Sequence, residues 1–165
     1  MLKLVKKINK NFFITMMVGA ITIGALTGCS SKKEEAKNIS AVEIGEQIKA
    51  TVKLDDMKEG DNIKLEKLYD IKADDVENFV LYTASTNLKA DEIAVIKAKD
   101  SNNVEDIKEK LSKRVEEQGK SFKDYLPEEY FLIEKHVLKN KDNYILLAIS
   151  KDADKIEASF DEALK

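Results

Sequence analysis

Apolar residues first recur at four-residue steps at Ile44, Ile48 and Val52, which places them on one face of a helix. Ser40 and Glu43 match a capping box, in which two side chains pair with free backbone N–H groups at a helix start. The pattern predicts a helix over about residues 41–53, followed by a polar turn region. Residues 63–71 have apolar positions without a clean period, so we expect an irregular or briefly helical segment folded onto the core.

Two pairs of strands are predicted further along the chain. Residues 78–85 and 92–99 are rich in β-branched, aromatic and other apolar side chains, and the short loop between them favours a hairpin. Residues 137–138 and 144–149 predict a second hairpin, which turns at about residues 140–142.

Three more helices are predicted around these strands. A stripe of apolar residues marks a long helix over about residues 102–120, with Asp100 and Ser101 as candidate caps. Pro127, the only proline, can occupy the first position of a short helix. Asp152 or Asp154 is expected to cap a last helix, whose inner face holds Ile156, Phe160 and Leu164.

The predicted elements follow the order α-ββα-ββα. The two ββα units can be interpreted as a weak internal repeat, or simply as two strand pairs that each precede a capped helix. Because hairpins rather than long crossovers join the strands, the sheet should be antiparallel. The sequence therefore predicts an α+β fold with about four strands from two hairpins and with helices packed against the sheet.

The N-terminal residues have the pattern of a secretory signal. Four lysines within residues 1–11 precede an apolar run over about residues 12–25, and small residues follow. The run is shorter than the roughly 20 apolar residues that cross a bilayer. Leu26, Thr27, Gly28 and Cys29 close the run and resemble the lipobox of bacterial lipoproteins.

The lipobox resemblance implies that Cys29 receives a thioether-linked diacylglycerol and becomes the mature N-terminus. Two acyl chains suffice for stable anchoring. The alternatives are an ordinary signal peptide with an incidental cysteine, or an uncleaved anchor helix. We expect a signal peptide at residues 1–28, a flexible tether at residues 29–38 and a single domain at residues 39–165. The lipid on Cys29 would hold this domain on the extracytoplasmic face of the cell membrane.

The composition of the expected mature chain excludes several functions. Residues 1–28 contain four lysines and no acid, so 24 of the 28 Lys and Arg residues remain against 31 acids, a net charge of −7. This acidic balance argues against nucleic acid as a partner, because phosphate binding requires clustered Lys and Arg. Cys29 is the only cysteine, so its lipidation leaves no thiol for a disulfide or a metal site.

The spacing of Arg114, Gln118, Phe122 and Tyr125 would place them along one side of the long helix and its exit. Arg114, Gln118 and Tyr125 can be interpreted as a binding patch, with a guanidinium for a carboxylate or phosphate. The structural interpretation is that Phe122 packs while Arg114 and Gln118 bond the loop around Pro127.

Other candidate chemistry is sparse. Asp124, Glu128 and Glu129 could supply paired carboxylates for acid–base catalysis or calcium binding. Alternatively, the two acids that follow Pro127 stabilise the start of a helix. His136 is the only histidine and lacks a recognisable nucleophile or further ligands. We therefore predict no metal site, no cofactor and no catalytic residue.

Part of the sequence resembles a known family. Residues 91–96, then Arg114, Gln118, Phe122, Tyr125 and Pro127, and then residues 143–147 are similar to the domain-of-unknown-function 4358 family. The resemblance covers roughly residues 39–160 and implies a small cell-surface lipoprotein of Gram-positive bacteria, with no assigned activity. Many members have a glycine in the last hairpin turn, where this chain has residues 139–143 without one.

Three functions fit the sequence. The first is a non-enzymatic, membrane-anchored module that binds an envelope protein or a small ligand. The second is a small solute-binding lipoprotein that serves a transporter, although such proteins usually close two lobes over a ligand. The third is an envelope hydrolase that would use Glu128 or Asp124.

Overall fold

A five-stranded antiparallel sheet forms the centre of the fold, with the strand order β1-β2-β3-β5-β4. The computed structural model describes residues 38–165. The expected signal peptide, Cys29 and residues 30–37 of the expected tether lie outside the described residues. The strands are β1 (Met57–Glu59), β2 (Val76–Ala84), β3 (Glu92–Ala98), β4 (Val137–Lys141) and β5 (Tyr144–Ile149).

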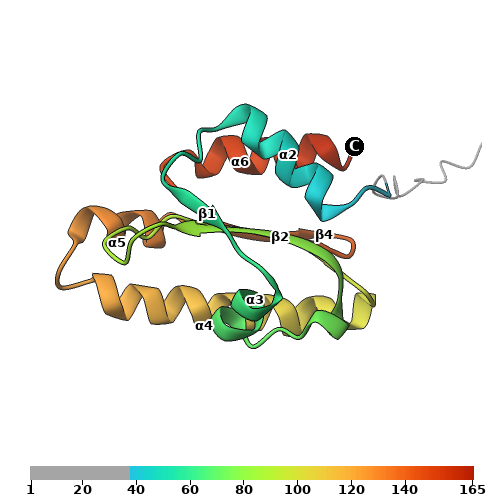
Figure 1. Cartoon of the computed structure of the whole chain (residues 1–165), viewed down its shortest axis with the longest axis horizontal. Helices are drawn as coiled ribbons and strands as arrows, with labels where there is room; N and C mark the ends of the chain where they lie inside the picture. Colours follow the sequence, from blue (N-terminus) through green and yellow to red (C-terminus); the bar gives the residue numbers. More distant parts are fainter. Residues whose placement is uncertain (1–37) are drawn as a thin grey trace, which may run out of the picture. The chain divides into compact units, whose positions relative to one another are not determined.

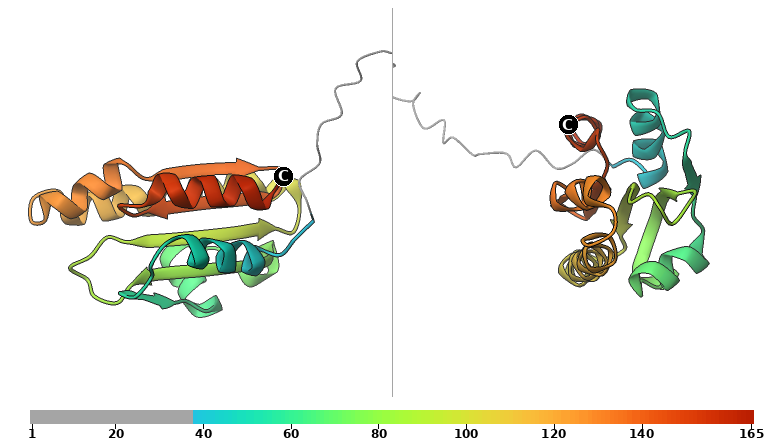
Figure 2. Two further views of the ribbon diagram at one scale, coloured as in Figure 1. Left: turned by 90° about the horizontal axis from the view of Figure 1, so that it is seen from above. Right: turned by 90° about the vertical axis from the view of Figure 1, so that its left-hand side faces the viewer.

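Helices cover both faces of the sheet (Figure 1). The first pair, α2 (Ala41–Thr51) and α6 (Ala153–Ala163), lies side by side over one face, as the view from above shows (Figure 2). The other face carries α3 (Asn62–Tyr69) and the long α4 (Val104–Phe122). The short α5 (Pro127–Glu134) lies at one end of the described domain, beside the loop that joins β2 to β3.

The core consists of two apolar layers that the central strands separate. Ile93 and Val95 of β3 pack toward α2 and α6, whereas Ala94 and Ile96 pack toward α3 and α4. The same alternation continues along β5, because successive side chains of a strand point to opposite faces. Every residue of β3 and β5 is buried. These strands therefore lack the apolar–polar alternation that is typical of a sheet with one solvent-exposed face.

Helix α2 approaches the sheet closely at Gly45. A β-carbon there would lie 2.6 Å from Cγ1 of Val80, so any larger residue would push the helix away from β2. The predicted capping box is present, since Ser40 Oγ accepts from the N–H of Glu43 and the Glu43 carboxylate accepts from the N–H of Ser40. Local sequence thus sets the start of α2, and a small residue sets its distance from the sheet.

The α+β class and the antiparallel sheet are confirmed, and the sheet has one strand more than the four expected. The additional strand, β1, lies in the stretch that was predicted as a turn region. Its three residues pair with the edge of β2 through their backbone, so the strand has no apolar pattern from which it could be predicted. The segment after it is helical, with Leu65 and Tyr69 buried; Ile63, expected on the core, is 74% exposed.

The second hairpin turns at Asp142 and Asn143, because Lys141 pairs with Tyr144. Asp142 has a φ of 51°, in the left-handed region that glycine adopts most easily. Aspartate tolerates this region better than most residues, which explains how the turn forms without glycine. No helix among residues 38–165 is long and apolar enough to cross a membrane.

Candidate functional site

The candidate site begins with a buried carboxylate at the start of a buried strand. Glu92 is the first residue of β3 and only 2% exposed. It lies on the same face of the strand as Ala94 and Ile96, so it points into the layer of α3 and α4. A buried carboxylate is costly unless it is paired and hydrogen-bonded, and both helices supply partners.

Three side chains donate hydrogen bonds to Glu92. Tyr69 of α3 donates from its hydroxyl to Oε1 over 2.8 Å. Arg114 of α4 donates from Nη2 to Oε2 over 2.8 Å, with its Nε 3.2 Å from Oε1. Gln118, one helical turn further, donates from Nε2 to Oε2 over 2.6 Å. We call Tyr69, Glu92, Arg114 and Gln118 the Glu92 cluster.

The charges of the Glu92 cluster are reflected in two pKa values. Burial, together with the negative charge of Glu92, raises the pKa of Tyr69 well above its usual value of 10.0. Burial by itself would lower the pKa of Arg114, but the hydrogen bond and charge of Glu92 outweigh it and raise that pKa. The phenol therefore stays protonated and the guanidinium stays cationic, which keeps both as donors to the carboxylate.

The amide of Gln118 is only half satisfied. A carboxylate without its proton can only accept, so the amide must turn its Nε2 toward Glu92. Its Oε1 then points elsewhere, and this atom is buried without a hydrogen-bond partner among the described residues. Gln118 as a whole is 5% exposed. An unpaired buried acceptor costs about 1–3 kcal/mol, so a donor at this position would be stabilising.

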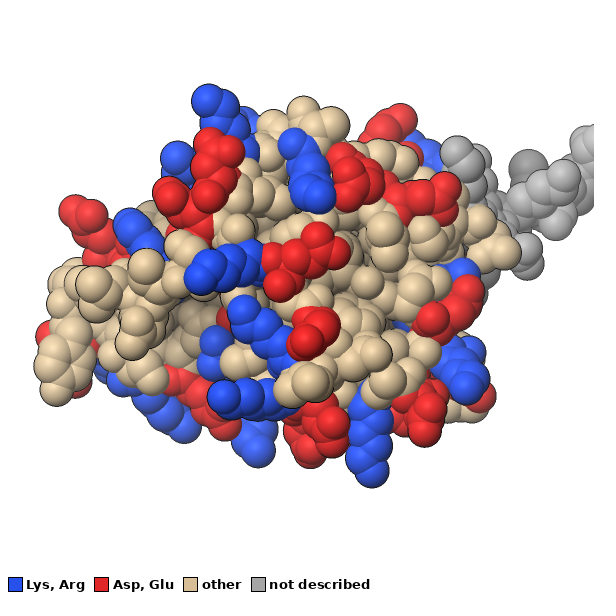
Figure 3. Space-filling view, viewed as in Figure 1, with Lys and Arg blue, Asp and Glu red and all other residues tan. Residues whose placement is uncertain are grey.

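A cavity of about 570 Å³ lies next to this amide. Its wall combines α3, the end of β2, the β2–β3 loop and one side of α4, and it includes Glu92, Arg114 and Gln118. The space-filling view shows the surface hollowed between α4 and the β2–β3 loop (Figure 3). The volume falls within the range of about 300–1,000 Å³ that is usual for ligand sites.

Lys64 of α3 provides a cation in the same wall. Its ammonium donates to Oγ1 of the buried Thr83. Thr83 stands directly opposite Glu92 in the pairing of β2 with β3. One cross-strand pair therefore holds Lys64 on one side and the Glu92 cluster on the other.

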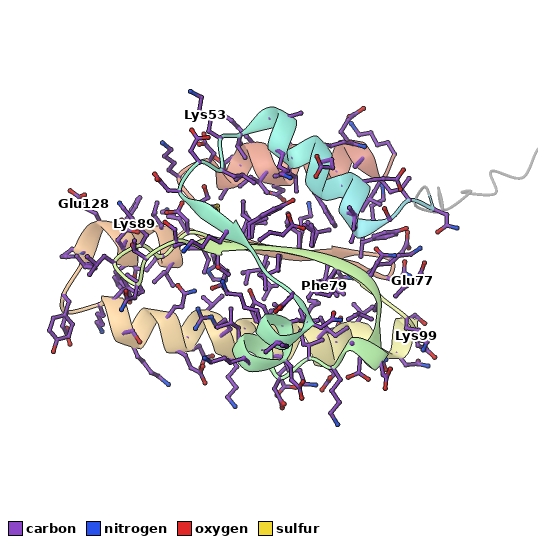
Figure 4. The ribbon with its side chains drawn as sticks, in the orientation of Figure 1. Lys53, Glu77, Phe79, Lys89, Lys99 and Glu128 are labelled. Carbon is purple, nitrogen blue, oxygen red and sulfur yellow. The ribbon has the colours of Figure 1, made fainter. Side chains whose placement is uncertain are left out.

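The β2–β3 loop is attached to α5 by a second buried carboxylate. Glu129 accepts from the backbone N–H of Ala90 over 2.8 Å and from the Lys89 ammonium over 2.6 Å. Lys89 and Glu128 extend from the loop and from α5 at the same end of the described domain (Figure 4). Glu129 is thus engaged in shaping the cavity wall, while Asp124 and Glu128 are exposed.

The structure brings together two of the three residues of the predicted binding patch. Arg114 and Gln118 share Glu92 and line the cavity, so their structural partner is this carboxylate rather than the loop around Pro127. Tyr125 follows the end of α4, is 82% exposed and is not part of the cavity lining. His136 bonds the carbonyl of Ile133 through Nδ1 at 2.7 Å.

The sequence prediction missed the central residue of the site, Glu92, and its neighbours Tyr69 and Lys64. The one available signal was an acidic residue at the start of an otherwise apolar strand, which costs free energy unless partners are present. Within residues 38–165, no group of three or more His, Asp or Glu residues is arranged to hold a metal ion.

Comparison with known proteins identifies a family and nothing more specific. A family model described as "Domain of unknown function (DUF4358)" matches residues 50–150 of the 165-residue chain. The matched region contains the Glu92 cluster, Lys64 and the whole cavity wall. No curated protein and no solved structure matches the chain.

Proposed function

The chain belongs to the DUF4358 family, and we propose that it is a lipid-anchored extracytoplasmic binding module whose cavity takes a small polar ligand. The module is proposed to be non-enzymatic. Its anchor would be the diacylglycerol on Cys29, and its site would be the cavity beside the Glu92 cluster.

The single observation that supports ligand binding is the Gln118 amide. Its Nε2 is fixed by a carboxylate, and its Oε1 is buried with no donor among the described residues, while the side chain of Gln118 lines the cavity. A protein that needed Gln118 only to hold Glu92 would gain nothing from an unpaired acceptor at this place. A ligand that donates to Oε1 would satisfy the last polar atom of the cluster.

The rigid surroundings of the cavity also support binding. Arg114, Gln118 and Tyr69 are held by one carboxylate, and Glu129 holds the loop on the other side. A site whose side chains are already ordered loses less conformational entropy when a ligand enters. The proposed module therefore does not require closure of a second lobe.

Replacement of Gln118 tests the proposed site. The full chain, purified in detergent, is titrated calorimetrically with the twenty standard amino acids, common monosaccharides, hydroxy acids and inorganic phosphate. At least one compound should bind, and Gln118→Met should weaken its binding at least tenfold, because methionine keeps the length of the side chain but lacks the acceptor. At 100 times its dissociation constant, the ligand should stabilise the wild-type chain by about 2.7 kcal/mol.

The matched control is Gln47→Met, the same substitution at an exposed position of α2 in the opposite layer. It should leave binding unchanged. The proposal of a ligand site fails if no compound binds, or if the Gln118→Met chain binds as tightly as the wild type.

Replacement of Cys29 tests the proposed anchor. Cys29→Ala removes the thiol that would form the thioether, so cells that express this variant should show no incorporation of labelled palmitate into the protein. Ser30→Ala, which leaves the thiol in place, should be labelled like the wild type. Persistent labelling of the Cys29→Ala chain would show that the anchor is not on this residue.

Delivery of the bound solute to a transporter is a second candidate function. The same cavity favours it, because a solute-binding lipoprotein requires a small-molecule site close to the membrane. Deletion of the protein should then reduce uptake of the compound that binds in the titration above, whereas a module that only senses the compound would leave uptake unchanged.

A further inference from the structure

The charges around the cavity restrict the chemistry of its ligand. This inference rests on the proposed small-ligand site. We infer that the cavity binds a free amino acid, with the carboxylate of the ligand on Lys64 and its ammonium group on Gln118 Oε1.

The first requirement is a hydrogen-bond donor. Gln118 Oε1 can only accept, and its own Nε2 is committed to Glu92. A ligand that presents only acceptors, such as an unsubstituted carboxylate or a fully ionised phosphate, would leave this atom unpaired. An ammonium group has three donors and suits this position.

The second requirement is an anion beside Lys64. The other cations of the wall are already paired, since Arg114 contacts Glu92 and Lys89 contacts Glu129. Lys64 instead donates to the neutral hydroxyl of Thr83, and among the described residues it forms no ion pair. An ammonium group has three N–H donors, so at least one remains for a carboxylate on the ligand.

The third requirement is that the ligand also carries positive charge. Asp91 and Glu117 line the cavity, and neither forms an ion pair within residues 38–165. Burial raises the pKa of Asp91, and the negative charge of Glu129 adds to this effect. A purely anionic ligand would add to this repulsion, whereas an ammonium group would relieve it.

The two polar ends of the site are attached to one pair of opposed strand residues. Lys64 is attached to Thr83 and Gln118 to Glu92, and these two strand residues form a directly opposed pair. Opposed residues in an antiparallel pair have Cβ atoms about 4.5–5.5 Å apart. The inferred ligand therefore places its two charged groups beside this strand pair, and the cavity of about 570 Å³ leaves room for its side chain.

Titration with matched ligands tests the inference. The full chain in detergent is titrated with each of the twenty amino acids. For the tightest of them, two analogues follow: its α-amide, which lacks the carboxylate, and its α-hydroxy acid, which lacks the ammonium group. Each analogue should bind at least tenfold more weakly than the amino acid.

A matched pair of lysine variants tests the assigned position of the carboxylate. Lys64→Met should weaken binding of the amino acid at least tenfold and should remove the preference over the α-amide. Lys67→Met, on the same helix but outside this cavity, should leave both quantities within twofold of the wild type. Unfolding of each variant by urea, followed by circular dichroism, shows whether both chains are folded during the titration.

The outcomes separate the inference from the proposed function. If a sugar, a hydroxy acid or phosphate binds in a Gln118-dependent manner while no amino acid binds, the ligand site stands and the inferred ligand class is wrong. If an amino acid binds but Lys64→Met has no effect, the assigned orientation is wrong. If none of these compounds binds, both the inference and the ligand site fail.

Discussion

Strand β3 buries two charged side chains, Glu92 at its start and Lys97 near its end, in opposite layers of the fold. They are 2% and 5% exposed, respectively. The ammonium of Lys97 donates to Asn38 Oδ1 and to Glu77 Oε1, each over 2.8 Å, and lies 5.4 Å from the centre of the Tyr144 ring. These contacts tie the beginning of the described domain to the sheet.

The two sites differ in what they leave unpaired. The partners of Lys97 engage its donors, and Glu77 is 48% exposed, so its carboxylate is open to solvent. Two partners of Glu92, Tyr69 and Gln118, are themselves buried, and Gln118, which lines a cavity, retains an unpaired acceptor. Burial of a charge thus does not by itself identify a binding site. The informative feature is a polar atom that the fold leaves without a partner.

The largest expected effect is the loss of stability when the charge of Glu92 is removed. Glu92→Gln should lower the free energy of unfolding by about 3 kcal/mol, because it leaves the partly buried Arg114 without its ion pair. The new amide would also present N–H donors where the surrounding side chains, such as Gln118, require an acceptor. Urea unfolding at pH 7 measures the change. Glu116→Gln, at an exposed position of α4 outside the cavity, serves as the control and should change stability by less than about 0.5 kcal/mol.

A smaller effect is expected from pH, through Tyr69. Its pKa is raised by burial and by Glu92, so the folded state favours the protonated phenol. This contribution to stability is complete below the unfolded pKa of about 10 and is lost as the pH rises toward the folded pKa. Between pH 10 and 11, stability should therefore decrease more steeply in the wild type than in Tyr69→Phe.

The difference between the two slopes is limited to about 1.4 kcal/mol per pH unit for one proton. Burial also raises the pKa of Tyr82, and this residue titrates in both chains, so it does not affect the difference. Equal slopes in the two chains would show that Tyr69 does not share its environment with a charged Glu92.

The smallest effect is expected at the other charge of β3. Lys97→Met should lower the free energy of unfolding by only about 1 kcal/mol, because the half-exposed Glu77 can be hydrated when its partner is lost. The variant should bind the ligand of the Glu92 site as the wild type does. A loss as large as that of Glu92→Gln would contradict the distinction drawn between the two charges.

The structure places two residues of the predicted binding patch together and the third apart from them. Arg114 and Gln118 are four residues apart within a clear apolar stripe, so their shared helix face follows from helix geometry. Tyr125 was grouped with them by extending the same periodicity. Helix α4 ends at Phe122, however, so the spacing no longer places Tyr125 on that face.

The sequence by itself determined the α+β class, most of the helices and strands, and a lipobox-like pattern that remains a prediction. Such features depend on local periodicity, caps and turns, which a few neighbouring residues define. Only the tertiary structure decided that Glu92 lies between Tyr69 and Arg114, and that Gln118 lines a cavity and keeps an unpaired oxygen. These contacts join residues more than twenty positions apart, and packing of helices on the sheet, rather than local geometry, brings them together.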